Sequence, residues 1–591
     1  MMYTGLDSTA KDKEDLSTTI VQTRRQSGVS FIDIAILLGL AIAALLPRII
    51  LAFQLDMVTD EAVYIGAGKA AFPLLEHLQI GASGWNYVYE APPLVKLLIG
   101  LFITLNSKLA HPLAELIAAR IPSIIMGTLL ILAIYWLGRA PLGRVVALLA
   151  ALCLAFSPWL AYFSALAYLD TTMTALITIA YLLFWHAPQR PKLYPLAAVL
   201  VGLGADSKYT AVLLVPGMIA FTAYYFFVLC RRLPVEQRPR LPWGWWISAI
   251  IVAPLTFLVA DPAIWPSPYN LLMHSFLFEW NHAAGGHLTF IAGRANLHAP
   301  HWTIPFILLA KMSLFVTVPA AFFACYALIQ LVRFHLHASG IEISDVTNLS
   351  FILIWLIASI GMSSLLTIVV GTHYALPAAP PVALAGAYAL TKFLGYRRGN
   401  LFSLPTSETP PTEASQAQIA LPPQKAKLNP RAVAAIALLT IALAGPHLVG
   451  LISIPDAEGY SSELFHGENT AVQVAYPGYR DALQWLEENT HGSASVGIVT
   501  ISYLGIGSQS TFWYYFNKGF ATRYQLVAVY PGAHIPIYDY MIFPMNLIQR
   551  GMTIPAPWKY HIIHTISGGN TTYCYITART SPNLIGRGQP K

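Results

Sequence analysis

The sequence predicts an all-α polytopic membrane protein of about eleven transmembrane helices, followed by a small extracytoplasmic α/β domain at its C-terminal end. Of its 591 residues, 56% are hydrophobic and only 11% are charged, and the mean hydropathy is +0.57. A soluble domain carries about 25% charged residues. Long apolar runs recur up to residue 451, without the two-residue alternation of barrel strands. Basic cytoplasmic loops account for the net charge of +7, so no nucleic-acid partner is expected.

Basic residues in short loops set the expected topology. The expected spans are about 31–53, 117–138, 145–163, 168–185, 194–207, 209–229, 243–260, 303–332, 349–371, 377–391 and 432–451. Between them Lys and Arg cluster at Arg24/Arg25, Arg139/Arg144, Arg190/Lys192, Arg231/Arg232/Arg238/Arg240, Arg333, Lys392/Arg397/Arg398 and Lys425/Lys427/Arg431, which the positive-inside rule places in the cytoplasm. All of these basic loops fall on the cytoplasmic side only if the apolar segment 92–109 does not cross the membrane, and instead lies along the outer surface or re-enters. The protein is therefore expected in the plasma membrane as a multi-pass protein with a cytoplasmic N-terminus and an extracytoplasmic C-terminal domain.

Composition divides the chain further. We expect a cytoplasmic tail (1–30), a transmembrane catalytic domain (31–398), a flexible cytoplasmic linker rich in Pro, Ser, Thr and Gln (399–430), a last span (431–451) and an outer α/β domain (452–591). Within the outer domain, periodicity predicts a helix from Tyr479 to Glu488 and strands at Ser495–Ile501, Tyr560–Ile566 and Thr571–Ala578.

An acidic pair directly beyond the first span carries the main functional signal. Asp60 and Glu61 stand at the membrane edge, where a carboxylate can act as a general base on a substrate that a lipid brings in. Asp60 would take a proton from an acceptor hydroxyl or amine while that group attacks C1 of a sugar. Tyr64 would share its helix face. A solvated loop or helix cap, with Tyr64 in the interfacial aromatic belt, is the structural alternative.

Further ionisable residues fall on the same side. Asp170 follows a span, Lys208 stands between two spans against the positive-inside trend, and Arg48 lies near the outer end of the first span. Such groups are costly at the membrane edge and are often functional. Lys208 and Arg48 could bind a phosphate, or they could snorkel. Asp170 could instead cap the next helix.

Histidines supply the remaining candidates. The long loop 261–302 holds His282, His287 and Trp302, which could bind sugar rings and phosphate or could be ordinary loop residues. Glu90, before two prolines, could orient the acceptor, pair with Lys96, or hold a divalent metal with an outer histidine. The histidine spacings match no defined metal motif, so we expect that no cofactor is required.

Several of these residues occur in motifs of a known family. Asp60-Glu61 with Tyr64, then Glu90-Ala91-Pro92-Pro93-Leu94 and Lys96, resembles the first outer loop of the GT-C polyprenyl-phosphate-sugar glycosyltransferases. These include the protein O-mannosyltransferases and the lipid A aminoarabinose transferases. Further matches follow in the same order at Arg120-Ile121-Pro122, Asp170, Ser207-Lys208-Tyr209, Gly286-His287-Leu288-Thr289-Phe290, Trp302, Lys311 and His373-Tyr374-Ala375-Leu376-Pro377.

The resemblance implies a GT-C fold and an inverting transfer of a sugar from a polyprenyl-phosphate-linked donor to an acceptor outside the cytoplasm. Asp60, with Glu61 beside it, would be catalytic, and Lys208 with Arg48 would bind the donor phosphate. Substrate contacts would come from Tyr64, Tyr89, Glu90, Asp170, His287, Trp302, His373 and Tyr374, and a metal, if one is bound, would be held by Glu90, His282 and His287. Ala91 stands where protein mannosyltransferases carry His and aminoarabinose transferases carry Lys, so the acceptor stays unknown.

Two other functions remain open at this point. A lipid-linked sugar flippase or transporter would explain the spans and the buried charges, but it would not require an acidic pair in a surface loop. A non-catalytic relative that only binds glycan would explain the outer domain. Replacing Asp60 by Asn would separate an enzyme from both.

Overall fold

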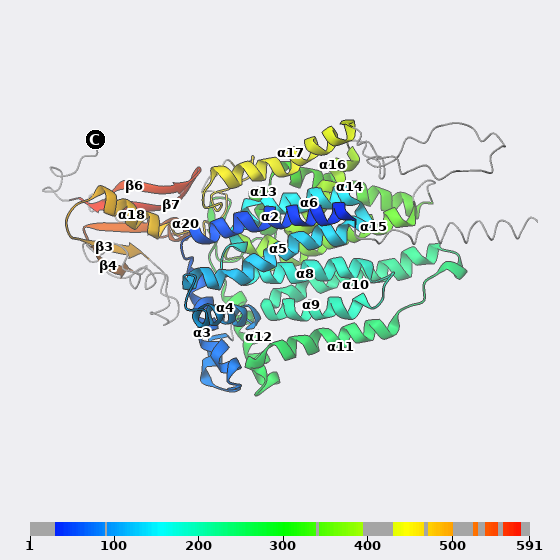
Figure 1. Cartoon of the computed structure of the whole chain (residues 1–591), viewed down its shortest axis with the longest axis horizontal. Helices are drawn as coiled ribbons and strands as arrows, with labels where there is room; N and C mark the ends of the chain where they lie inside the picture. Colours follow the sequence, from blue (N-terminus) through cyan, green and yellow to red (C-terminus); the bar gives the residue numbers. More distant parts are fainter. Residues whose placement is uncertain are drawn as a thin grey trace, which may run out of the picture.

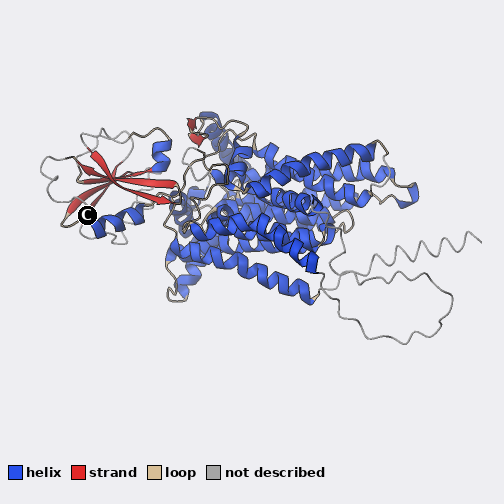
Figure 2. Cartoon of the chain, turned by 90° about the horizontal axis from the view of Figure 1, so that it is seen from above, coloured by secondary structure: helices blue, strands red, loops and turns tan. Residues whose placement is uncertain are grey.

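The structure is a computed structural model that describes residues 30–88, 91–337, 342–393, 430–465, 471–499, 524–529, 538–553 and 560–580. It consists of a large helical body with a small sheet at one end of its long axis (Figures 1 and 2). The helices of the body are α2 (Phe31–Gln54), α3 (Thr59–Glu76), α4 (Leu94–Lys108), α5 (Glu115–Leu142), α6 (Arg144–Phe156), α7 (Pro158–Ser164), α8 (Leu169–His186), α9 (Leu193–Ser207), α10 (Val215–Tyr224), α11 (Trp243–Ala260), α12 (Pro268–Gly285), α13 (Thr303–Lys311), α14 (Leu314–His335), α15 (Ile343–Ser363), α16 (Ala379–Phe393) and α17 (Pro430–Ser453). Short 3-10 helices η2 (Tyr209–Leu214) and η7 (Thr372–Ala378) precede α10 and α16.

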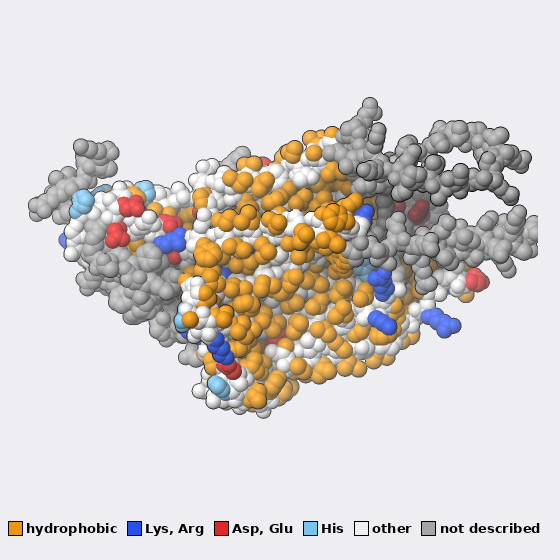
Figure 3. Space-filling model, in the orientation of Figure 1, with side chains coloured by type: hydrophobic (Ala, Val, Ile, Leu, Met, Phe, Trp, Pro, Cys, Tyr) orange, Lys and Arg blue, Asp and Glu red, His pale blue; other side chains and the backbone are white. Residues whose placement is uncertain are grey.

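The helical body is built for a membrane. Apolar side chains cover its visible flank, while the charged side chains in this view gather toward the two ends (Figure 3). Helix α11 buries none of its residues within the protein and exposes Trp243, Ile250 and Leu255. Such a surface requires lipid rather than water around it. The protein is therefore a multi-pass membrane protein, as the sequence predicts.

Every segment expected to span the membrane contains a helix, but the expected count of eleven is not reached. Among the described residues, seven helices are long and apolar enough to cross a bilayer, or eight if α6 and α7, bent by 64° at Ser157, form one span. Helix α9 is apolar but too short, and α8 and α16 are not among the seven. The expected span 303–332 is divided at Ser313, whose hydroxyl accepts a hydrogen bond from the backbone N–H of Phe315 and starts α14.

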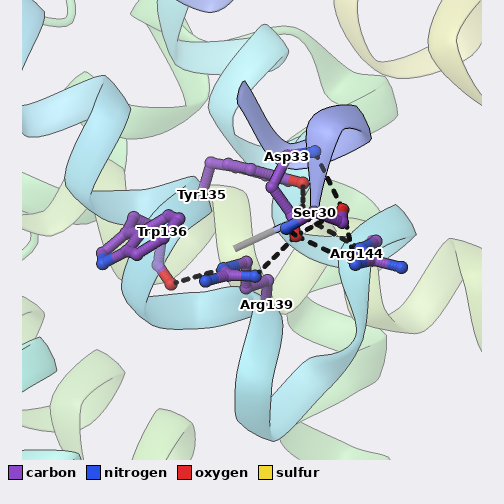
Figure 4. Close-up of polar contacts among 6 residues, drawn as sticks. All are labelled: Ser30, Asp33, Tyr135, Trp136, Arg139 and Arg144. Atoms are coloured by element: carbon purple, nitrogen blue, oxygen red, sulfur yellow. Dashed lines mark hydrogen bonds and ion pairs between the residues drawn. The ribbon is translucent and has the colours of Figure 1, made fainter. Parts of the chain in front are cut away.

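One polar cluster fixes the relative direction of the first helices (Figure 4). Asp33, near the start of α2, is fully buried and accepts hydrogen bonds from the Tyr135 hydroxyl at 2.8 Å and from Arg139 and Arg144 at 2.9 Å. The start of α2 therefore lies beside the turn between α5 and α6. Helix α5 therefore runs antiparallel to α2 and ends where α2 begins. The chain makes no additional membrane crossing between α2 and α5, so α4 does not span the membrane, as the charge pattern predicts.

Helices α3 and α4 form a tightly packed pair at the end of the body that faces the sheet (Figure 1). A Cβ added at Gly68 would lie 2.5 Å from the carbonyl oxygen of Lys96, and one at Gly100 would overlap the carbonyl oxygen of Gly68. Only glycine permits this approach of two helix backbones. Ion pairs join Lys69 to Glu115 and Lys108 to Glu76 at the rim of the pair.

The C-terminal part contains a five-stranded sheet in the order β4-β3-β5-β7-β6. Its strands are β3 (Ala494–Val499), β4 (Tyr524–Val529), β5 (Tyr540–Pro544), β6 (Tyr560–Gly568) and β7 (Thr571–Arg579), and it is accompanied by α18 (Tyr479–Asn489) and α20 (Met545–Gln549). Strand β3 pairs in parallel with β4 and β5, and β7 pairs antiparallel with β5 and β6. Helix α18 buries Leu483 and Leu486 against Ile498 and Ile576. The helix and three strands predicted here from periodicity are all present.

The position of α4 predicts a labelling pattern. In a background of Cys325→Ser, which removes the exposed cysteine among the described residues, Ser83→Cys and His111→Cys should react with a membrane-impermeant maleimide from the same side. Gln237→Cys, in the loop before α11, should react only after permeabilisation. Labelling of Ser83→Cys and His111→Cys from opposite sides would show that α4 crosses the membrane.

Candidate functional site

A buried ion pair organises the region around the acidic pair. The carboxylate of Glu61 is bound by Arg120 of α5 through Nε at 2.8 Å and Nη2 at 2.7 Å, and both side chains are 0% exposed. Glu61 also accepts hydrogen bonds from the backbone N–H groups of Val58, at 3.0 Å, and Ala167, at 2.8 Å. With both oxygens engaged and no exposed surface, Glu61 is not placed to contact a substrate. Its expected catalytic role is replaced by a structural one.

Arg120 extends this connection to the end of α2. Its Nη1 donates to the carbonyl oxygens of Ala52 and Leu55, and its Nη2 donates to that of Asp56. These carbonyls are left without helical partners where α2 ends, so the guanidinium satisfies them. Arg120 thereby joins the end of α2 and the start of α3 to α5, and Glu61 continues the connection to the turn before α8.

Asp60, next to Glu61, points its side chain toward another partner and stays partly exposed. Its Oδ2 accepts a hydrogen bond from the hydroxyl of Tyr168 at 2.8 Å. The ring of Tyr64 stands edge-on to that of Tyr168, with centroids 5.8 Å apart. Within the described ranges no hydrogen bond is found at Oδ1 of Asp60, so one carboxylate oxygen is available to a substrate. The sequence reasoning did not assign a role to Tyr168, although it stands two residues before the predicted Asp170.

Asp170 and Lys208 form the second polar pair. Nζ of Lys208 lies 2.8 Å from Oδ1 of Asp170 and 4.0 Å from the centroid of the Tyr374 ring. The second oxygen of Asp170 is buried without a hydrogen-bond partner among the described residues. Asp170 and Tyr374 line a small pocket together with Met173, Thr210, Leu214, Ser363, Leu366 and Pro377. The structure thus brings together three residues that are 38 to 204 positions apart in the sequence.

His373 connects the two pairs. Its ring centroid lies 5.5 Å from those of Tyr168 and Phe163, so it packs between the Asp60 partner and the preceding helix. Its ring centroid also lies 4.8 Å from that of Tyr374, above which the ammonium of Lys208 stands. Successive contacts therefore link Asp60, Tyr168, Asp170, Lys208, His373 and Tyr374 into one cluster, which we call the acidic–basic cluster. It combines an accessible carboxylate with a largely buried cation, because the Lys208 side chain is 15% exposed.

Arg48 does not join this cluster. It is 0% exposed, and its Nη1 donates to the carbonyl oxygens of Ala44 and Ala155. A Cβ at Gly127 would lie 3.1 Å from its Nε. The guanidinium is therefore held between α2, α5 and α6. It does not snorkel to the surface, and no described contact joins it to Lys208.

The histidines beyond α12 form a separate group. The rings of His282 and His287 lie 5.8 Å apart, just before the hairpin of β1 (Thr289–Ile291) and β2 (Arg294–Asn296). Burial, and then the positive charge of Arg550, lower the pKa of His287. Trp302 packs on Phe306 and is 48% exposed.

No metal centre is found in the part of the chain that the structure describes, where no three His, Cys, Asp or Glu side chains are grouped to hold an ion. Tyr89 and Glu90 lie outside the described residues. The metal site predicted from Glu90, His282 and His287 therefore stays a prediction.

Comparison with known proteins supports the family resemblance inferred from the sequence motifs. Residues 90–259 match the family model described as dolichyl-phosphate-mannose-protein mannosyltransferase. The resemblance to these glycosyltransferases is confirmed. A search of curated proteins finds no match.

Two solved structures align with the chain. ArnT from Cupriavidus metallidurans bound to undecaprenyl phosphate aligns with 13% identity and a TM-score of 0.46, over 95% of this chain and 99% of that one. The Archaeoglobus fulgidus oligosaccharyltransferase tethered with an acceptor peptide aligns with 14% identity and a TM-score of 0.44, over 84% of this chain and 64% of that one.

Removing one partner of the buried ion pair should destabilise the protein strongly. Arg120→Met leaves the charge of Glu61 buried and uncompensated, which costs about 3–5 kcal/mol. We expect a markedly lower Tm in detergent. Glu115→Gln, which breaks the exposed pair with Lys69, is the matched control and should change Tm little. Equal effects of the two substitutions would contradict the role given to Arg120.

Proposed function

We propose that the chain is an inverting glycosyltransferase that moves a sugar from a polyprenyl-phosphate-linked donor to an acceptor outside the cytoplasm. The single observation that carries the proposal is the acidic–basic cluster, in which Asp60 keeps one oxygen without a hydrogen bond from the described residues and Lys208 supplies an ammonium. The family match over residues 90–259 supports the same class of donor, because its description names a dolichyl-phosphate sugar. Sugar and acceptor are not specified by either.

The proposed reaction follows from the chemistry of the two groups. Oδ1 of Asp60 takes the proton of an acceptor hydroxyl or amine while that oxygen or nitrogen bonds to C1 of the sugar. The bond between C1 and the phosphate oxygen breaks with its electron pair on the phosphate, which leaves as an anion. Attack on the face opposite the phosphate inverts the anomeric centre, and Asp60 later releases its proton to water.

Lys208 is suited to receive the leaving phosphate. An ammonium has three N–H donors, of which one is directed at Asp170. The others are free to bind phosphate oxygens, and Tyr374 fixes the ammonium above its ring. A preorganised cation stabilises charge that develops on the leaving group. Since phosphate then needs no acid to leave, we propose that the transfer requires no metal, and that Arg48 does not bind the donor.

The site is proposed to face the outside. The opposite end of α5 and the start of α6 carry Arg139 and Arg144, which bind Asp33. The positive-inside rule places that end in the cytoplasm. The N-terminus would then be cytoplasmic, and the sheet of β3 to β7 would lie outside the plasma membrane with the acidic–basic cluster.

The first experiment measures transfer or release of sugar from radiolabelled polyprenyl-phosphate hexose by purified protein in the presence of EDTA. Loss of a general base lowers turnover by about 10²–10⁴-fold, so Asp60→Asn should lose that much kcat. Asp345→Asn, an exposed carboxylate at the start of α15, should match the wild type. Donor binding should survive in Asp60→Asn.

Three outcomes would contradict parts of this proposal. Equal turnover of wild type and Asp60→Asn would remove Asp60 from catalysis. Activity that appears only after adding Mg²⁺ or Mn²⁺ would contradict the metal-free mechanism. Absence of turnover in the wild type across several sugars and acceptors would favour a flippase or a glycan-binding protein.

We expect Lys208 to act mainly by binding the phosphate of the donor. Lys208→Met removes the cation that faces the donor, so kcat/KM for the donor should fall at least about tenfold. Lys69→Met, in the exposed pair on α3, is the control and should keep wild-type kinetics. An unchanged kcat/KM in Lys208→Met would exclude Lys208 as the phosphate ligand.

A further inference from the structure

We propose that Tyr168 is a positioning residue, which fixes the carboxylate of Asp60 by holding Oδ2 so that Oδ1 faces the acceptor. The inference rests on the proposed role of Asp60 as the base. Its geometric basis is the 2.8 Å hydrogen bond from the Tyr168 hydroxyl to Oδ2. A carboxylate has two equivalent oxygens and rotates freely unless one of them is held. Fixing one oxygen therefore selects the other for proton transfer.

Tyr168 is itself held firmly enough for this role. It is 3% exposed, and its ring packs against those of Tyr64, Phe163 and His373, with centroids 5.8, 5.6 and 5.5 Å away. Its backbone carbonyl accepts a hydrogen bond from Ser123 at 3.3 Å. With its ring surrounded on three sides, the hydroxyl cannot follow a moving carboxylate.

The same two backbone segments are joined a second time next to this bond. Glu61 follows Asp60 on α3, and it accepts the N–H of Ala167, which precedes Tyr168, at 2.8 Å. Adjacent residues on one segment thus bind adjacent residues on the other. The Glu61–Arg120 ion pair sets the separation of the segments, and the Tyr168 hydroxyl sets the direction of the Asp60 side chain.

A nearby tyrosine shows that burial alone does not explain the contact. Tyr162 is also fully buried, yet its hydroxyl has no hydrogen-bond partner among the described residues. A tyrosine can therefore be accommodated in this region without binding a carboxylate. Tyr162→Phe removes a buried hydroxyl from the same helix–turn segment and leaves Asp60 untouched, so it is the matched control for Tyr168→Phe.

The kinetic test compares wild type, Tyr168→Phe, Tyr162→Phe and Asp60→Asn with the same radiolabelled polyprenyl-phosphate hexose. Tyr168→Phe should lower kcat about 10- to 100-fold and keep the donor KM within about twofold. Tyr162→Phe should match the wild type in both. Wild-type kcat in Tyr168→Phe, with Asp60→Asn inactive, would overturn the inference and leave the proposed function standing.

A measurement without turnover tests the hydrogen bond even if no transfer is detected. The infrared difference between the wild type and Asp60→Asn isolates the carboxylate stretching bands of Asp60. A hydrogen bond to one oxygen makes the two oxygens unequal and widens the separation between the antisymmetric and symmetric bands. That separation should narrow in Tyr168→Phe and stay unchanged in Tyr162→Phe. An unchanged separation in Tyr168→Phe would overturn the inference.

A second variant covers the case in which Tyr168→Phe fails to fold, which its Tm would reveal. Site-specific 3-fluorotyrosine at position 168 keeps the ring and the hydroxyl but makes the hydroxyl a stronger donor. The separation of the two carboxylate bands of Asp60 should then widen, opposite to the effect of Tyr168→Phe. An unchanged or narrower separation would contradict the hydrogen bond to Asp60.

Discussion

The ion pair between Glu61 and Arg120 is the interaction on which the rest of the site depends. Both charges are fully buried, and besides each other they bind backbone groups at the end of α2, at Val58 and at Ala167. Burying two charges is expensive, and it is compensated only when geometry and additional hydrogen bonds are good. Here the extra bonds close the end of α2, start α3 and fix the turn before α8. These bonds fix the backbone at the start of α3, and this sets the position of the neighbouring Asp60.

A second buried carboxylate performs a comparable task at the far end of the same helices. Asp33 accepts bonds from Tyr135, Arg139 and Arg144, so both ends of α2 are attached to α5 by charged hydrogen bonds. Apart from Arg48, which lies against Gly127 of α5, the contact between these two anchors is largely apolar, and apolar packing alone tolerates sliding of one helix along another. The two polar anchors define the register of α2 on α5.

The sequence was sufficient for the helical membrane architecture, for the placement of α4 and for most strands of the outer part, because hydropathy and periodicity are local properties. It also singled out Asp60, Asp170, Lys208 and His373, which do meet. It named both Asp60 and Glu61 as catalytic, with Asp60 as the base, since their different partners are set only by folding. For Arg48 it left phosphate binding and snorkelling open, because a charge near a helix end can face lipid or protein, and folding buries its guanidinium between α2, α5 and α6. Tyr168 was passed over because a tyrosine among apolar residues has no local signature of its partner.

The backbone contact between Gly68 and Gly100 has a consequence for how this protein can vary. Since α3 is held against α4 by this backbone contact and against α5 by Arg120, a side chain at either glycine would push α3 out of place. Asp60 stands on the first turn of α3, so that displacement would reach the carboxylate although both glycines lie outside the acidic–basic cluster.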